Sequence, residues 1–212
     1  MAFPGAGSVA KGLGADRGER AFPPVGPSAG LVAEQERAMN ISVRDIPPPP
    51  TSAALLKMAM RRLTGGVVVV TAGSGDERVG LTATSAVSLS VDPPTMLVCV
   101  NRASSTWPVI ARRRHFCVSI LGAEHQAVAE RFAGIGSLRG AERYQGADWI
   151  VMRSGASGLA GAQAIVDCEI DEVIERHSHA ILLGAVREVR VAHQESGSLV
   201  YRLGCFGSVP LA

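Results

Sequence analysis

The stretch VGLTATSAVSLSVDPPTMLVCVN, residues 79–101, determines the predicted fold. It is mostly apolar, yet five of its side chains carry hydroxyl groups, at Thr82, Thr84, Ser85, Ser88 and Ser90. The Asp-Pro-Pro run at 92–94 interrupts it, because proline cannot donate a backbone hydrogen bond within a sheet. The stretch therefore predicts two strands, residues 79–90 and 95–100, joined by a turn.

The hydroxyl groups of the first strand fall mostly on one face. Successive side chains of a strand point to opposite faces. Strict alternation places Thr82, Thr84, Ala86, Ser88 and Ser90 on one face, and Ala83, Ser85, Val87 and Leu89 on the other. The hydroxyl face is either the solvated side of an ordinary sheet or the lining of a site for a polar ligand.

The rest of the chain extends this pattern. Further strands are predicted over residues 67–71, 115–121, 164–175, 179–192 and 199–203, and helices over 51–63, 106–114 and 123–132. Strands follow strands through short turns, so the fold class is mainly β: an antiparallel sheet or barrel with a few peripheral helices. The sequence has neither a Rossmann fingerprint nor a P-loop, so a nucleotide cofactor would be held without either.

Composition divides the chain into a tail and one domain. Residues 1–50 are rich in Gly, Ala and Pro and are predicted to be disordered, whereas residues 51–212 form the domain. The net charge of +2 gives no basic surface for nucleic acid. No apolar run is long enough to span a bilayer, and the N-terminus lacks a secretory pattern. We therefore expect a soluble cytoplasmic protein with no membrane partner.

The four cysteines are Cys99, Cys117, Cys168 and Cys205, and none forms a CxxC pair. Three of them lie in apolar, strand-like runs, so we interpret them as buried reduced thiols. The ligand clustering that a metal site needs is absent from the pattern, and no metal is predicted.

The segment NRASST, residues 101–106, lies between a predicted strand and a predicted helix. Free backbone N–H groups and hydroxyls at such a point, with Arg102 beside them, suit a phosphate group. The alternative is that Ser104 or Ser105 caps the helix with no ligand involved.

The chain resembles the short-chain flavin reductases, the reductase components of two-component flavin monooxygenases. The resemblance runs over about residues 55–206. It includes the motifs at 80–85, 88–90, 92–94 and 97–99 of the stretch above. It continues with those at 64–67, 104–107, 116–118, 131–133, 146–149 and 179–186. Single motifs are short, but their order and spacing match over most of the domain.

This resemblance implies an antiparallel FMN-binding split β-barrel that forms a homodimer and holds FMN or FAD. The residues that match the family's flavin contacts are Thr82, Ala83, Thr84, Ser85, Asn101, Ser104, Ser105, Thr106, Arg131 and Phe132. The hydroxyl-rich strand would then face the flavin, and the 101–106 segment would take its phosphate.

The resemblance also implies hydride transfer to the flavin from NADH or NADPH. His179 matches the family histidine beside the nicotinamide and is the candidate catalytic residue, with a purely structural histidine as the alternative. Tyr201, Arg202 and Phe206 fall on the nicotinamide side. Here the chain departs from the family, which usually ends this motif with tyrosine; Phe206 can stack but cannot donate a phenol hydrogen bond.

The implied function is that of an NAD(P)H-dependent flavin reductase that supplies reduced flavin to a partner monooxygenase. Two alternatives stay open. One is a split-barrel flavoprotein whose tightly bound flavin acts on its own organic substrate. The other is a non-catalytic barrel that binds flavin or heme.

Overall fold

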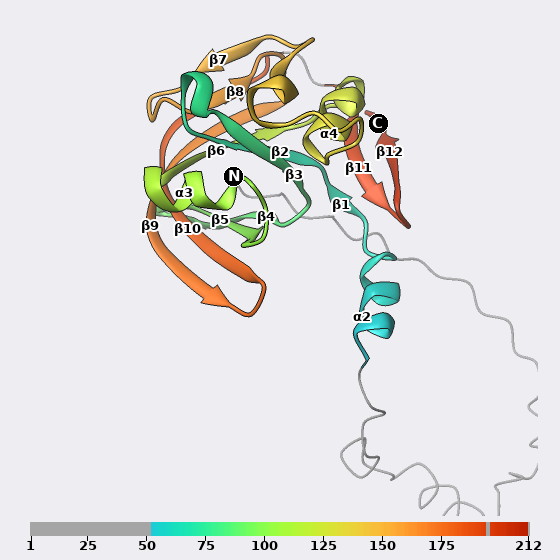
Figure 1. The fold of residues 1–212 in the computed structure, drawn as a ribbon. Coiled ribbons are helices and arrows are strands. Elements are labelled where there is room, and N and C mark those ends of the chain that lie inside the picture. Colours follow the sequence, from blue (N-terminus) through green and yellow to red (C-terminus); the bar gives the residue numbers. More distant parts are fainter. Residues whose placement is uncertain (1–51, 194–195, 212) are drawn as a thin grey trace, which may run out of the picture. The chain divides into compact units, whose positions relative to one another are not determined.

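The computed structural model describes residues 52–193 and 196–211 (Figure 1). The strands are β1 (Gly65–Gly66), β2 (Val68–Ala72), β3 (Val79–Ala83), β4 (Ala86–Val91), β5 (Pro94–Asn101), β6 (His115–Ile120), β7 (Trp149–Val151), β8 (Ser157–Leu159), β9 (Ala164–Arg176), β10 (His179–Val191), β11 (Ser198–Arg202) and β12 (Cys205–Val209). The helices are α2 (Ala53–Met60), α3 (Trp107–Arg113) and α4 (Gln126–Phe132), with 3-10 turns η1 (Gly75–Glu77), η2 (Ala123–His125) and η3 (Gly140–Tyr144). The predicted tail, residues 1–50, lies outside the described residues.

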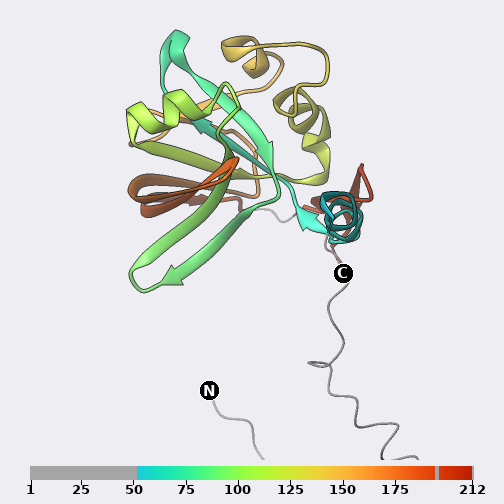
Figure 2. The same ribbon diagram turned by 60° about the horizontal axis from the view of Figure 1, so that its bottom comes forward.

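Seven strands form one antiparallel sheet in the order β3-β2-β6-β9-β10-β5-β4. Two smaller sheets, β1-β11-β12 and β7-β8, complete the described strands. The predicted fold class, mainly β and antiparallel, is confirmed. The large sheet is strongly curved, and the β4–β5 hairpin projects from it (Figure 2). Its two edge strands, β3 and β4, do not pair with each other, so the barrel is split between them.

The prediction of one strand over residues 79–90 is wrong. The chain leaves the sheet at Thr84 and Ser85 and enters it again at the opposite edge, so β3 and β4 are separate strands. The apolar–hydroxyl alternation runs through this point with no glycine or proline, and alternation alone therefore could not show the break. Thr84 and Ser85 form the corner where the two edges of the split sheet meet.

The core lies on both faces of the central strands. All five residues of β2 are buried, and they alternate between two clusters. Val69 packs with Phe132 and Leu159, under α4 and the β7–β8 hairpin. Val68 and Val70 pack in the other cluster, inside the curve of the sheet. Burial on both sides explains why this strand reads as a continuous apolar run rather than an alternating one.

The apolar residues Ile181 and Leu183 predict one inward-facing side for β10, but the structure buries the other side. Ala180, Leu182 and Gly184 are the buried residues. Gly184 shows why: a Cβ atom there would lie 2.7 Å from the Phe116 ring, so the buried face needs a glycine at this point. His179 therefore shares the half-exposed face with Ile181.

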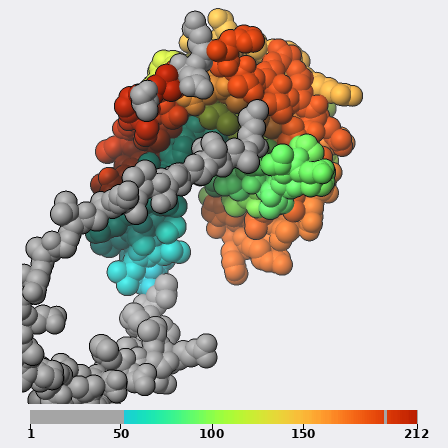
Figure 3. Space-filling model, turned by 180° about the vertical axis from the view of Figure 1, so that it is seen from behind, coloured from blue at the N-terminus to red at the C-terminus, as the bar shows by residue number. Residues whose placement is uncertain are grey.

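Helix α2 confirms the predicted N-terminal helix but buries none of its residues. Ser52 is its N-cap, and the Ser52 hydroxyl accepts a hydrogen bond from the backbone N–H of Leu55. At its other end, Arg61 bonds the backbone of Leu203 in the β11–β12 turn. In the space-filling view from behind, α2 (cyan) stands clear of the green and orange strands (Figure 3). None of the helices within the described ranges is long and apolar enough to cross a membrane.

Candidate functional site

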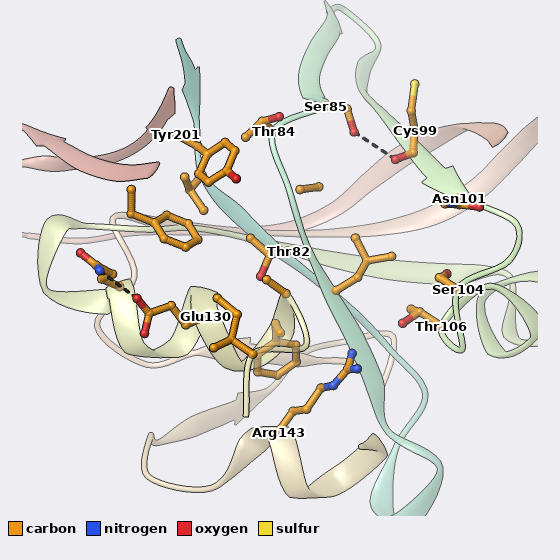
Figure 4. Close-up of a pocket in the computed structure, with 18 of the residues that line it drawn as sticks. Thr82, Thr84, Ser85, Cys99, Asn101, Ser104, Thr106, Glu130, Arg143 and Tyr201 are labelled. Carbon is orange, nitrogen blue, oxygen red and sulfur yellow. Dashed lines mark hydrogen bonds between the residues drawn. The ribbon is translucent and has the colours of Figure 1, made fainter. Parts of the chain in front are cut away.

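A pocket of about 860 Å³ opens beside the β3–β4 corner (Figure 4). Its wall comes from the ends of β3 and β5, from the turn before α3, from α4 and from the β11–β12 hairpin. It brings together most of the residues predicted for the site: Thr82, Ala83, Thr84, Ser85, Asn101, Ser104, Ser105, Thr106, Phe132, His179, Tyr201 and Phe206. Arg131 and Arg202 are not among the lining residues.

The hydroxyl groups of the β3–β4 corner are already hydrogen-bonded within the protein. The Thr82 hydroxyl donates to the Ala129 carbonyl of α4 at 2.6 Å. The Ser85 hydroxyl donates to the Cys99 carbonyl of β5 at 3.0 Å. Thr84 is exposed and covers Gly65, where a Cβ atom would lie 2.9 Å from the Thr84 Cβ. The corner is therefore a fixed wall that connects β3 to α4 and to β5.

The turn before α3 differs, because it holds a hydroxyl without a partner. The Ser104 Oγ is buried and has no hydrogen-bond partner in the described part of the chain. A buried polar atom normally has one. The Thr106 hydroxyl, by contrast, donates to the Gly80 carbonyl at 3.0 Å. Thr106 is the N-cap residue of α3 and makes no side-chain capping bond, so the capping role considered for Ser104 or Ser105 is wrong.

His179 lies at the mouth of the pocket, at the start of β10. It is opposite Asn101, the last residue of β5. Its side chain is exposed, and its Nδ1 lies 2.9 Å from the Ser178 hydroxyl. On another part of the wall, the rings of Tyr201 and Phe206 pack edge to face with centroids 5.1 Å apart. Imidazole and aromatic rings thus line the same pocket as the unpaired hydroxyl.

Arg143, which the sequence analysis did not identify, lines the pocket near the turn. Its Nη1 donates to the Gly80 carbonyl at 3.0 Å, the same oxygen that accepts from Thr106. Its Nε donates to the Leu138 carbonyl at 3.0 Å. In Figure 4 its guanidinium points toward β3. Arg143 lies in the loop-rich part of the sequence, where no periodicity marks it; the Gly80 backbone contact that positions it is tertiary.

Helix α4 contributes two further lining residues, Gln126 and Glu130, that the sequence analysis did not identify. Gln126 donates to the Glu130 carboxylate at 2.8 Å, and both line the pocket. They are one helical turn apart, and Glu130 directly precedes Arg131 and Phe132, so the spacing of the predicted helix could have suggested them. Glu130 is the carboxylate among the lining residues.

The cysteines are only partly buried. Cys117 and Cys168 are buried as predicted, and burial raises the pKa of the Cys168 thiol to about 12. Cys99 is half-buried and Cys205 is exposed, and both line the pocket, so the prediction of burial is wrong for them. Cys205 begins β12, a strand the sequence analysis did not predict.

Comparison with known proteins gives a consistent result. Residues 60–210 match the model of the flavin reductase like domain. The chain is 45% identical to FMN reductase (NADH) RutF 2 of Methylorubrum extorquens over 118 residues, 56% of this chain and 67% of that protein. It is 36% identical to the reductase component of 4-hydroxyphenylacetate 3-monooxygenase of Pseudomonas aeruginosa over 133 residues, 63% of this chain and 78% of that protein.

Among solved structures, the NADH:FAD oxidoreductase SgcE6 of Streptomyces globisporus superposes with a TM-score of 0.67 at 30% identity. The match covers 76% of this chain and 98% of that one. The family match spans the large sheet, the pocket and the β11–β12 hairpin. The chain therefore belongs to the flavin reductase like family.

Proposed function

We propose that the pocket binds FMN and that the protein reduces it with NADH. The observation that carries this proposal is the buried, unpartnered Ser104 hydroxyl in a turn that also carries Ser105 and Asn101. A phosphate oxygen would supply the missing acceptor, and hydrogen bonds to charged groups are the strong ones. The pocket, at about 860 Å³, is of the size that holds a cofactor. Thus the residues present fit a flavin mononucleotide.

The protein acts as an NAD(P)H:flavin oxidoreductase. Flavin, when bound, accepts a hydride from the reduced nicotinamide and carries the redox chemistry. The chain's residues position the two rings. The β3–β4 corner would hold the flavin edge and the turn would hold the phosphate, with Arg143 adding positive charge near the turn. His179 would orient the nicotinamide, and the packed rings of Tyr201 and Phe206 would contact it from another part of the wall. Arg131 and Arg202 do not line the pocket, so neither is assigned a ligand contact.

The choice of FMN and NADH rests on the names of the relatives. The RutF relative is named an FMN reductase (NADH), whereas SgcE6, at lower identity, is named an NADH:FAD oxidoreductase. The relative in Pseudomonas aeruginosa is the reductase component of a monooxygenase. By the same reasoning, this protein supplies reduced flavin to a separate monooxygenase in the cytoplasm, where NADH is available.

The test is a steady-state assay of NADH and NADPH oxidation against FMN, FAD and riboflavin. We expect NADH with FMN to give the highest kcat/KM, saturation in added FMN, and a largely colourless purified protein. A protein that purifies with flavin and needs none added would instead be a flavoprotein with its own organic substrate. Absence of NADH oxidation with every flavin would identify a non-catalytic barrel.

We further propose that the protein is a homodimer in which α2 contacts a second copy. The apolar side chains of α2 and the residues after it are exposed: Leu55, Leu56, Met58, Met60 and Leu63. A helix with an apolar surface normally buries it. Light scattering after size-exclusion chromatography should give twice the mass of 22.0 kDa. Replacing Leu56 and Met60 with glutamate should shift the protein toward monomer, whereas a monomeric wild-type protein would contradict the proposal.

Residues 1–50 are proposed to be a tail separate from the flavin reductase domain of residues 51–212. Their Gly- and Pro-rich composition is the support. Deleting residues 1–48 should leave kcat/KM for FMN within about threefold of the full chain, a change below 1 kcal/mol. A loss of about tenfold or more would mean that the tail completes the site or the dimer.

A further inference from the structure

A second pocket, of about 580 Å³, shares no lining residue with the first. We call it the arginine pocket. It is lined by Arg113, Arg114, His115, Arg153, Ser154, Glu169, Val186 and Arg187. These residues come from the end of α3, from β6, β9 and β10, and from the turn between β7 and β8. Helix α3 thus begins at the first pocket and ends at the second.

Irregular backbone conformations at Arg114 and Arg187 bring these two residues to the arginine pocket. Arg114 follows α3 in the left-handed conformation, with a φ of 56°, and ends the helix there. Arg187 lies at an irregularity in the pairing of β10 with β9, between Val186 and Glu188. Such bulges re-aim the side chain they carry. Two separate deviations from regular structure therefore place guanidinium groups around one cavity.

The β7–β8 turn is held in place by a buried carboxylate. Asp167 is fully buried and accepts hydrogen bonds from the Ser154 backbone N–H at 2.8 Å and from the Ser154 hydroxyl at 2.6 Å. The backbone N–H of Arg153 donates to Glu188 at 3.1 Å. The turn that carries Arg153 is thus fixed before any ligand arrives, which lowers the cost of binding.

Positive charge is in excess around the arginine pocket. Arg113 pairs with Glu77, and Arg187 pairs with Glu169 at 2.9 Å. Arg114 donates only to the carbonyls of Ile170 and Asp171, at 3.1 and 3.3 Å. The guanidinium of Arg153 has no hydrogen bond or ion pair within residues 52–193 and 196–211.

Neighbouring carboxylates do not remove this excess. Asp167 accepts from Ser154, and Glu188 also pairs with Arg190 at 2.8 Å. Burial lowers the pKa of His115 below its usual 6.5, so this side chain adds no charge at neutral pH. Arg114 and Arg153 thus line the cavity, and neither guanidinium forms an ion pair with a carboxylate in the described residues.

We propose that the arginine pocket binds a phosphate-bearing anion. Guanidinium groups present planar pairs of N–H donors that match phosphate oxygens. A cavity of about 580 Å³ is larger than one phosphate and admits a diphosphate with part of an attached group. This site would be distinct from the flavin pocket, and the ligand is either a free phosphate or the phosphate end of a nucleotide.

The experiment is isothermal titration calorimetry of the full chain, saturated with FMN, at constant ionic strength set with chloride. The probes are inorganic phosphate, pyrophosphate and ADP. We expect saturable binding, tightest for pyrophosphate if the source is a free anion and for ADP if it is a nucleotide. Arg153→Gln should weaken binding at least fivefold, and Arg187→Gln should weaken it less, because Glu169 already pairs with Arg187. Arg176→Gln, at the exposed end of β9 and outside the pocket, is the matched control and should change binding less than twofold.

A further variant, Glu169→Gln, is expected to change the affinity in the opposite direction. Glu169→Gln removes the carboxylate from the lining and should tighten pyrophosphate binding by about threefold, an effect typical of partly exposed charges. Absence of saturable binding to the wild-type protein would overturn the proposal. So would binding that is lost in Ser104→Ala but kept in Arg153→Gln, since the anion would then occupy the flavin pocket.

Discussion

Two parts of the same pocket wall use their hydroxyl groups in opposite ways. At the β3–β4 corner, the hydroxyls of Thr82 and Ser85 donate to backbone carbonyls of neighbouring elements. In the turn before α3, the Ser104 hydroxyl is equally enclosed but has no partner in the described residues. The comparison separates residues that build the pocket from one that is available for a ligand, although both look alike in the sequence.

The largest effect should come from Ser104→Ala. If this hydroxyl bonds the flavin phosphate, its loss should raise the Kd for FMN by about 10- to 100-fold, because a hydrogen bond to a charged group is worth about 1.5–3 kcal/mol. Riboflavin has no phosphate, so its Kd should change less than about twofold. Flavin fluorescence titration of both ligands measures the difference. Equal weakening of FMN and riboflavin would place the phosphate elsewhere.

The reverse behaviour is expected of Thr82→Val, which keeps the shape but removes one of the two hydrogen bonds that the Ala129 carbonyl accepts, the other coming from the Ala133 backbone N–H. The free energy of unfolding should fall by about 0.5–1.5 kcal/mol, the net contribution of a typical hydrogen bond. The ratio of the FMN and riboflavin affinities should stay the same. Urea denaturation provides the measurement, with Thr84→Val as the control, because Thr84 is exposed. A stable Thr82→Val protein that binds FMN poorly would abolish the distinction between corner and turn.

His179 is expected to affect the rate of flavin reduction rather than flavin affinity or stability. His179→Ala should slow flavin reduction by about tenfold, or about 1.4 kcal/mol in the barrier, because a misplaced nicotinamide ring loses rate. The flavin Kd should stay within about twofold, since the residue lies at the pocket mouth. Stopped-flow reduction across NADH concentrations, beside a flavin titration, tests this. A variant with lower thermal stability and weaker binding of every ligand would show a structural histidine instead.

The smallest effect concerns the ion pairs at the C-terminal end of α3, the helix that follows the turn of residues 101–106. Glu77 pairs with Arg112 and Arg113, and the Arg113 hydrogen bond holds the pKa of this carboxyl below its usual 4.5. A lowered pKa contributes stability that is present above pH 4.5 and is lost as the pH falls through the folded-state value. Glu77→Gln should therefore lower the free energy of unfolding slightly at pH 7, where the ion pair is formed, and reduce the acid sensitivity of unfolding below pH 4.5. Unchanged acid sensitivity would mean that the pair does not anchor α3.

The sequence predicted the antiparallel class, most strands, and a pocket wall made from the stretch at 79–101. It did so because local periodicity and turn residues record pairing within a hairpin. The split between β3 and β4 was not predictable in this way, since it depends on which strands occupy the two edges of the sheet. The inward face of β10 depends in the same way on the fit of Gly184 against Phe116.

The site was predictable where it follows a motif and not where it follows a tertiary contact. Ser104 was identified from its place between a predicted strand and a predicted helix and again through the family resemblance, whereas His179 was identified through the resemblance alone. Arg143 was missed because its position depends on the Gly80 carbonyl, 63 residues away in the chain. The exposure of Cys205 was not predicted, since this residue begins β12, a strand that the sequence did not indicate.

The position of β3 and β4 at opposite edges has a consequence for the order of folding. Two strands separated by only Thr84 and Ser85 never pair with each other; each depends on a partner from elsewhere, β2 for β3 and β5 for β4. The corner takes its final shape only when β6, β9 and β10 bridge the two partners. Such non-local closure is slow relative to hairpin formation. Flavin-binding competence should then be among the last properties to appear during refolding, and a ligand at this corner selectively stabilises chains whose sheet is complete.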